Sequence, residues 1–218
     1  LGVLVERVSD LSLDRFTEKY IFDPLDMNDT GFRPRGRVSK RAAATEFSPW
    51  HERFLVGEVH DENAYAFGGV AGHAGLFSTA DDLAIFCQML LNEGSYGDVR
   101  IMQPETVRMM LTPQIEQEVL ERGSGFLKNR EQLIGWWQMG SKPEVTGSGG
   151  LPSETAFGHT GFTGTSIWID PEHDMFAILL TNAVHPSRET CNRSAVRKAF
   201  YESIWRAMGI EPPAEEEE

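Results

Sequence analysis

Apolar residues recur with helical spacing at both ends of the chain. The first set follows an i, i+3, i+4, i+7 pattern and comprises Leu1, Leu4, Val5 and Val8. The last set forms one stripe and comprises Val196, Ala199, Phe200, Ser203, Ile204, Ala207 and Met208. The spacing predicts a helix that is under way at the first residue, a second helix after Ser12, and a long terminal helix.

Local signals mark two more helices in the middle of the chain. Ser78 and Thr79 are typical N-cap residues, and Asp81 and Asp82 follow where the helix dipole favours anions. We expect this helix to end near Gly94. Pro104 is typical of the first position of a helix, so another helix is expected to begin there.

The second half of the chain reads as strands. The segments Leu133–Met139, Thr155–His159, Thr163–Ile169 and Met175–Thr181 are predicted strands, and Asp170–Asp174 is the turn of a hairpin. Helices and loops therefore come first, an antiparallel meander follows, and a terminal helix packs on one sheet face. This order predicts an α/β protein of the α+β type, with an antiparallel β-sheet flanked by helices.

A long segment between these regions has no helical or strand period. Residues 33–75 include Gly57, Gly68, Gly69, Gly72 and Gly75. A loop of this length in a compact domain is usually functional or disordered, and its aromatic and histidine content argues against disorder. We expect a functional loop.

Composition limits the range of functions. The 218 residues are 40% hydrophobic, enough for one core, and we expect one domain over residues 1–210 with an acidic tail over 211–218. The net charge of −13 argues against a nucleic-acid partner. There is no apolar run of 18 residues, so no membrane span is expected, and no signal peptide is visible. Cys87 and Cys191 read as ordinary thiols.

The most promising chemistry lies at His159, Thr160 and Gly161, at the start of the hairpin. A glycine just inside a strand allows close approach to the backbone, and alternation places His159 and Gly161 on one face. The Phe162 N–H would then be an oxyanion donor beside a bound substrate. The alternative is a glycine-rich hairpin end with a merely exposed histidine. His173, in the hairpin turn, is expected to have no role.

The remainder of a catalytic site is not evident from spacing. The sequence contains no Ser-x-x-Lys, no convincing Gly-x-Ser-x-Gly and no His-Glu-x-x-His. His60-Asp61 and His73 resemble a metal pair, but no third ligand is suitably spaced, so neither a metal nor another cofactor is expected. A Ser/His/Asp triad assembled in space stays open.

Four stretches resemble the serine hydrolases related to class C β-lactamases and low-molecular-weight penicillin-binding proteins, a family that includes esterases and peptidoglycan amidases. Leu1–Phe32 resembles the helix pair and Pro-Leu-Gly-Met segment after the family's Tyr motif, with Asp26 in place of the usual glycine. Gly57–Gly94 is similar to one subgroup's central segment, and Phe157–Pro186 resembles the third motif and its following strands. The terminal helix also fits.

The resemblance implies a β-lactamase/transpeptidase-like fold that is incomplete. Of the three family motifs only the last, Lys/His-Thr-Gly, is present, at His159, Thr160 and Gly161. The Ser-x-x-Lys and Tyr motifs would precede Leu1, so an N-terminal part carrying the nucleophile is an expected partner. By matched position, the Phe162 N–H would supply one oxyanion donor.

The resemblance also adds candidate binding residues. His73 falls in the segment that borders the family's substrate cleft, although a loop-packing role is at least as reasonable. His60 and Asp61 belong to the subgroup signature and either pin the long loop or act in catalysis, the first being favoured. A periplasmic or other extracytoplasmic location is implied by the family.

The function implied is hydrolysis of an amide or ester through an acyl-serine intermediate. A histidine titrates near neutral pH, whereas binding a carboxylate favours a permanent cation, so an esterase or an amidase acting on peptidoglycan fragments is favoured over a β-lactamase. The substrate would be a small molecule or a peptidoglycan fragment. The competing hypothesis is a catalytically inactive, truncated or binding module that retains the fold.

Overall fold

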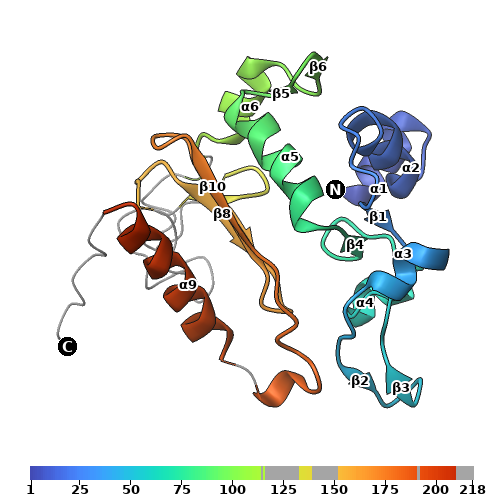
Figure 1. Cartoon of the computed structure of the whole chain (residues 1–218). Helices are drawn as coiled ribbons and strands as arrows, with labels where there is room; N and C mark the ends of the chain where they lie inside the picture. Colours follow the sequence, from blue (N-terminus) through green and yellow to red (C-terminus); the bar gives the residue numbers. More distant parts are fainter. Residues whose placement is uncertain (114, 116–132, 139–151, 191, 210–218) are drawn as a thin grey trace. The chain divides into compact units, whose positions relative to one another are not determined.

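The structure, a computed structural model, describes residues 1–113, 115, 133–138, 152–190 and 192–209, and it contains two compact units (Figure 1). The first unit comprises Leu1–Ile101 and Asn182–Cys191, and the second comprises Met102–Thr181 and Asn192–Glu218. The expected acidic tail over 211–218 lies outside the described residues.

The first unit consists mainly of short helices and two-stranded sheets. Its helices are α1 (Gly2–Ser9), α2 (Leu13–Thr17), the π-helix η1 (Glu18–Phe22), α3 (Gly36–Arg41), α4 (Glu62–Ala66), α5 (Ala80–Leu91) and the 3-10 helix η3 (Arg188–Thr190). Its strands pair as β1 (Gly31–Phe32) with β4 (Leu76–Phe77), β2 (Phe47–Ser48) with β3 (Arg53–Phe54), and β5 (Ser95–Tyr96) with β6 (Val99–Arg100).

The start of α5 is fixed by hydrogen bonds, as its sequence predicts. The Thr79 side chain accepts from the Asp82 amide and caps the helix. The Asp82 carboxylate is buried and accepts from the Asp29 amide at 2.9 Å and the Thr30 hydroxyl at 2.7 Å. Because the carboxylate is satisfied by these donors, it can be buried, and it ties the segment before β1 to α5.

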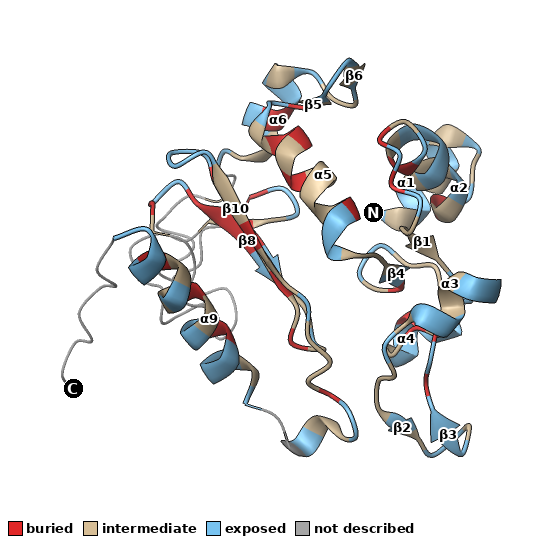
Figure 2. Ribbon diagram, viewed as in Figure 1, coloured by how far each residue is buried: buried red, intermediate tan, exposed pale blue. Residues whose placement is uncertain are grey.

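The helix predicted at the start of the chain is confirmed as α1, but its apolar stripe is not covered by the residues that the structure describes. None of the residues of α1 is buried, and Leu4 and Val8 are 57% and 78% exposed (Figure 2). In contrast, α5 buries Cys87, Met89 and Leu90.

Burial raises the pKa of the Cys87 thiol to about 12, so this thiol is unreactive, in line with the ordinary role expected of it.

The second unit is built around the predicted antiparallel meander. Its four-stranded sheet has the order β10 (Met175–Leu179), β9 (Ser166–Asp170), β8 (Phe157–Thr160) and β7 (Trp137–Gln138). The strand expected over Leu133–Met139 is shorter than predicted, because the residues before Trp137 form a bend and Met139 lies outside the described part. Helix α6 (Pro104–Met110) begins at Pro104 as predicted.

The terminal helix α9 (Arg193–Ala207) packs on the sheet, but through a different face from the one predicted. Its buried residues are Arg197, Tyr201 and Trp205, whereas Val196 is 51% exposed (Figure 2). Tyr201 joins Ala156, Trp168 and Ala177 in the core, with Phe200 and Ile204 at its margin. The buried face of α9 is therefore shifted by one residue from the predicted stripe. Tyr201 and Trp205 have large apolar surfaces, and their burial stabilises this orientation of the helix.

Candidate active site

His159 lies on β8, the strand that carries the third family motif. Its Nδ1 is 2.8 Å from the carbonyl oxygen of Thr160. A carbonyl only accepts, so Nδ1 carries the proton of this hydrogen bond. The ring lies against Trp137 with centroids 4.1 Å apart. His159 is exposed, so it is oriented by its neighbours while remaining accessible to a ligand.

Gly158, just before the motif, and Gly161, within it, both lie in close contact with the facing side of the hairpin. Gly158 pairs with Trp168 across the sheet, and a Cβ at Gly158 would lie 2.6 Å from the Trp168 ring. A Cβ at Gly161 would lie 2.3 Å from the Thr165 hydroxyl oxygen. A side chain at Gly158 would collide with the facing backbone and the Trp168 ring, whereas one at Gly161 would require the Thr165 hydroxyl to move.

Gly161 and Phe162 lie in a turn beyond the end of β8, not in the strand. The Gly161 amide donates to the Thr165 carbonyl at 2.8 Å, and the Gly164 amide donates to the Gly161 carbonyl at 3.0 Å. Gly161 lies one residue past the end of β8, but its pairing with Thr165 continues the register of the hairpin, so the expectation that His159 and Gly161 share a face stays a prediction. The Phe162 side chain is 55% exposed, and the Arg193 guanidinium lies 4.3 Å from its ring centroid.

His60 belongs to an ion cluster that joins distant parts of the first unit. Its Nε2 donates to the Glu46 carboxylate at 2.9 Å, and Arg188 donates to the same carboxylate through its amide at 2.9 Å and its Nε at 2.6 Å. The Arg188 Nη2 donates to Glu62 at 2.7 Å. Glu46 and Arg188 are 142 residues apart in sequence, so the cluster ties the 182–190 segment to the long loop.

The cluster strongly favours the charged form of Glu46. Partial burial raises the pKa of this carboxyl, but hydrogen bonds from the Arg188 amide, His60 and the Arg188 guanidinium outweigh that effect and lower the pKa from 4.5 to about 2. The pKa of Glu62 is also lowered, chiefly by its hydrogen bond from Arg188. His60 therefore has the contacts of a residue that pins the loop, which is the favoured one of the two roles predicted for it.

Asp61 and His73 form a hydrogen-bonded pair next to this cluster. The Asp61 carboxylate accepts from the Ala64 amide at 2.7 Å, which caps α4, and from His73 Nε2 at 3.0 Å. The Ala64 hydrogen bond lowers the pKa of Asp61 most, burial opposes it, and His73 lowers it further. Among the described residues no group of three or more His, Cys, Asp or Glu side chains is placed to hold a metal ion.

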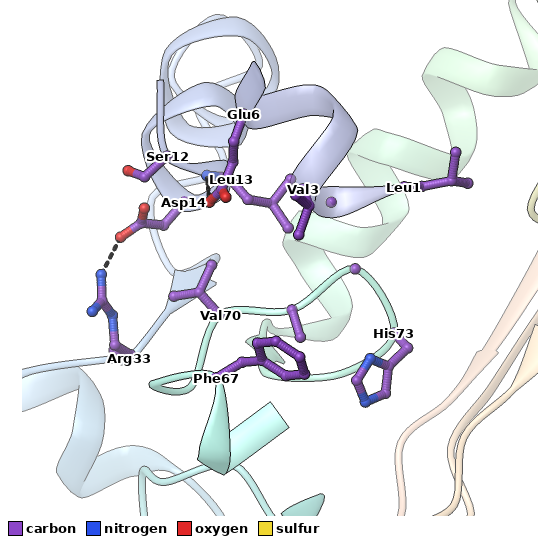
Figure 3. A pocket seen from close by; sticks show the side chains of 13 residues that line it. Leu1, Val3, Glu6, Ser12, Leu13, Asp14, Arg33, Phe67, Val70 and His73 are labelled. Carbon is purple, nitrogen blue, oxygen red and sulfur yellow. Dashed lines mark hydrogen bonds and ion pairs between the residues drawn. The ribbon is translucent and has the colours of Figure 1, made fainter. Parts of the chain in front are cut away.

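A pocket of about 550 Å³ lies within the first unit beside His73 (Figure 3). One side is formed by α1 and α2, and the other by the loop over residues 67–73. The lining is mostly apolar, with Val3, Leu13, Phe67 and Val70, and the Arg33–Asp14 ion pair lies at its edge (Figure 3). The volume is that of a typical small-molecule site. The apolar walls and few polar groups suit the same class of ligand.

The structure groups the predicted site residues in two sets. His60, Asp61 and His73 lie together in the first unit, and His159, Thr160, Gly161 and Phe162 lie together in the second. Sequence reasoning missed Arg197, Arg193, Trp137, Glu46 and Arg188. It also missed the hydrogen bond of His173, whose Nδ1 donates at 2.9 Å to the fully buried Asp170 carboxylate, while the silence of His173 in an activity assay stays a prediction.

Comparisons with known proteins agree with this architecture. A family model described as Beta-lactamase matches residues 1–200. A putative D-alanyl-D-alanine carboxypeptidase of Escherichia coli is 38% identical over 199 residues, which are 85% of this chain and 43% of that protein. An N-acetylmuramyl-L-alanine amidase of Bacillus subtilis is 37% identical over 85% of this chain and 42% of its own length. The chain thus spans less than half the length of these curated relatives.

Solved structures show the same fold. A β-lactamase from Mycobacterium bovis superposes with a TM-score of 0.63 at 19% identity, over 95% of this chain and 60% of that one. This confirms the predicted fold class, a β-lactamase/transpeptidase-like arrangement of helices and an antiparallel sheet. Within the described part of the chain, every helix is too short or too polar to cross a bilayer.

Proposed function

The chain belongs to the beta-lactamase family, and from that premise we propose that it forms part of a serine hydrolase that cleaves amide bonds in peptidoglycan fragments through an acyl-serine intermediate. The observation that carries the proposal is the exposed His159 near the end of β8, whose ring lies against Trp137 and whose Nδ1 donates to the Thr160 carbonyl. The location of peptidoglycan implies work outside the cytoplasmic membrane.

In this proposal the nucleophilic serine does not belong to the 218 residues of this chain. An acyl-serine mechanism of this family needs a serine activated by a neighbouring base, and Ser-x-x-Lys does not occur in this chain. The serine would attack the amide carbonyl, the amine would leave with a proton, and water would then release the acyl group. The Phe162 N–H would stabilise the developing oxyanion.

His159 would orient the substrate next to that oxyanion site. Its Nδ1 hydrogen bond to the Thr160 carbonyl fixes the orientation of the ring. A cationic imidazole would bind a carboxylate of the peptide, and a neutral one would assist proton movement. Thr160 and Gly161 shape the wall rather than react.

The names of the relatives indicate two candidate bonds for cleavage. One is the terminal D-alanyl-D-alanine bond, and the other is the amide between the muramyl group and L-alanine. Both lie in one class of molecule, a sugar–peptide fragment of the cell wall, so we propose that class as the substrate. The two identities, 38% and 37%, do not favour either bond.

A muropeptide that contains both bonds tests this proposal. The protein that joins this chain to a Ser-x-x-Lys segment is incubated with it, and products are identified by mass spectrometry. We expect release of either D-alanine or a free peptide, together with an acyl adduct on the serine in rapidly quenched samples. A protein that hydrolyses neither bond, or that turns over without acylating serine, would overturn the proposal. The 218-residue chain alone is the matched control and is expected to be inactive.

A further inference from the structure

The backbone carbonyls of residues 161–165, which form the turn after His159, all accept hydrogen bonds from side chains. Arg197 on α9 donates to the carbonyls of Gly161 at 2.6 Å, Gly164 at 3.0 Å and Thr165 at 3.0 Å. The Phe162 carbonyl accepts from Arg193 at 2.5 Å, and that of Thr163 accepts from the Thr181 hydroxyl at 3.0 Å. All five carbonyls of residues 161–165 therefore have a side-chain donor.

The buried position of Arg197 is unfavourable for a charged side chain unless its hydrogen bonds compensate. Arg197 is 7% exposed and lies on the same helix face as Tyr201 and Trp205, which fill the core. Burying a guanidinium costs free energy that apolar packing would not, unless its hydrogen bonds are well made. Three carbonyls from one turn match the rigid fork of donors that arginine has and lysine lacks. The position thus favours arginine for its geometry.

One of these hydrogen bonds acts on the proposed oxyanion donor. The Gly161 carbonyl and the Phe162 N–H belong to the same peptide group, which is planar and trans, so they point in opposite directions. When Arg197 binds the carbonyl, the direction of the N–H is fixed away from α9. A cationic donor on the oxygen also polarises the peptide group and strengthens its N–H as a donor.

We propose that Arg197 is a positioning residue of the active site, which aims and polarises the Phe162 N–H through the Gly161 carbonyl. The inference rests on the proposed function, since it requires an oxyanion at that amide. Arg193 supports the same turn one helical turn earlier, through the next carbonyl and the Phe162 ring. The competing role for Arg197 is to hold α9 on the sheet without any effect on catalysis.

Arg197→Lys separates these roles, because lysine keeps the charge but cannot bridge three carbonyls. In the protein that carries the nucleophile, we expect kcat to fall by about tenfold to a hundredfold with KM nearly unchanged, because an oxyanion contact is made mainly in the transition state. The matched control is Arg206→Lys on the same helix, where the exposed Arg206 pairs with Glu202. This control is expected to keep wild-type kcat.

A second measurement keeps the inference testable without turnover. In the 218-residue chain, ¹H–¹⁵N NMR should show a shifted and faster-exchanging Phe162 amide in Arg197→Lys, with the Trp168 amide of β9 unchanged. Equal kcat in variant and wild type, or a Phe162 amide that does not respond while the melting temperature falls, would overturn the positioning role. A wild-type protein with no hydrolase activity would instead overturn the proposed function, and it is recognised before any variant is compared.

Discussion

His60 and His159 show how differently one fold can use the same side chain. The His60 side chain is 10% exposed, and its Nε2 donates into a carboxylate that also binds Arg188. His159 is exposed, its Nδ1 donates to the adjacent Thr160 carbonyl, and its ring rests on Trp137. His159 contacts its neighbours in β7 and β8, whereas His60 reaches a residue 128 positions away. We propose that His60 holds the loop and that His159 acts on a substrate.

The largest effect is expected at His159. In the protein that carries the nucleophile, His159→Ala should lower kcat/KM by about tenfold to a thousandfold, because one positioned polar group is lost from the site. Steady-state hydrolysis of a muropeptide measures it. His51→Ala is the control, since His51 sits in the β2–β3 hairpin between Ser48 and Tyr65. Full activity of the His159→Ala variant would contradict a role of His159 in the active site.

Glu46→Gln should cost about 2 kcal/mol of unfolding free energy, because Arg188 and His60 lose a charged, partly buried acceptor. The pKa of Glu46 is lower in the folded state, so its carboxylate stabilises the fold above about pH 4.5, and this contribution is lost as pH falls toward about 2. Urea unfolding between pH 2 and pH 6 measures both effects. Glu62→Gln, at a 66% exposed partner of the same arginine, is the matched control and should cost much less.

His173→Ala is expected to destabilise the second unit by about 1 kcal/mol. The Asp170 carboxylate is fully buried and would lose the donor at His173 Nδ1, although it keeps the Ser153 hydroxyl and amide. Thermal unfolding compares this variant with Glu172→Ala, because the Glu172 side chain lies in the same turn and is exposed. If the two variants melt together, the contact with Asp170 carries no weight.

His73→Ala should have the smallest effect on stability, below about 1 kcal/mol, since its pair with Asp61 is half exposed. Asp61→Ala should cost more, about 1 kcal/mol, because the cap on α4 is lost as well. Chemical denaturation of both variants gives the order. A reversed order would mean that His73, rather than the cap, holds this loop.

Features set by neighbouring residues could be predicted from the sequence. The Thr79 cap, the start of α6 at Pro104 and the apolar strand from Met175 were all confirmed. Each depends on a few adjacent residues, and a local pattern is enough to find them.

Features set by contacts between distant residues could not. The buried face of α9 was missed because Arg197 reads as a surface residue until the carbonyls that it binds are known. Glu46 and Arg188 show no shared pattern, since 142 residues separate them. For the candidate site, the family motif located His159, but only the folded hairpin revealed that a side chain at Gly158 would collide with the facing strand.

The central claim is that His159, and not His60, faces the substrate. Imidazole ¹H–¹⁵N NMR tests it directly in the longer protein, with the nucleophilic serine changed to alanine so that a muropeptide binds without turnover. We predict that the His159 ring signals shift in a saturable way during the titration while those of His60 stay in place. A saturable shift at His60 with no response at His159 would contradict the account.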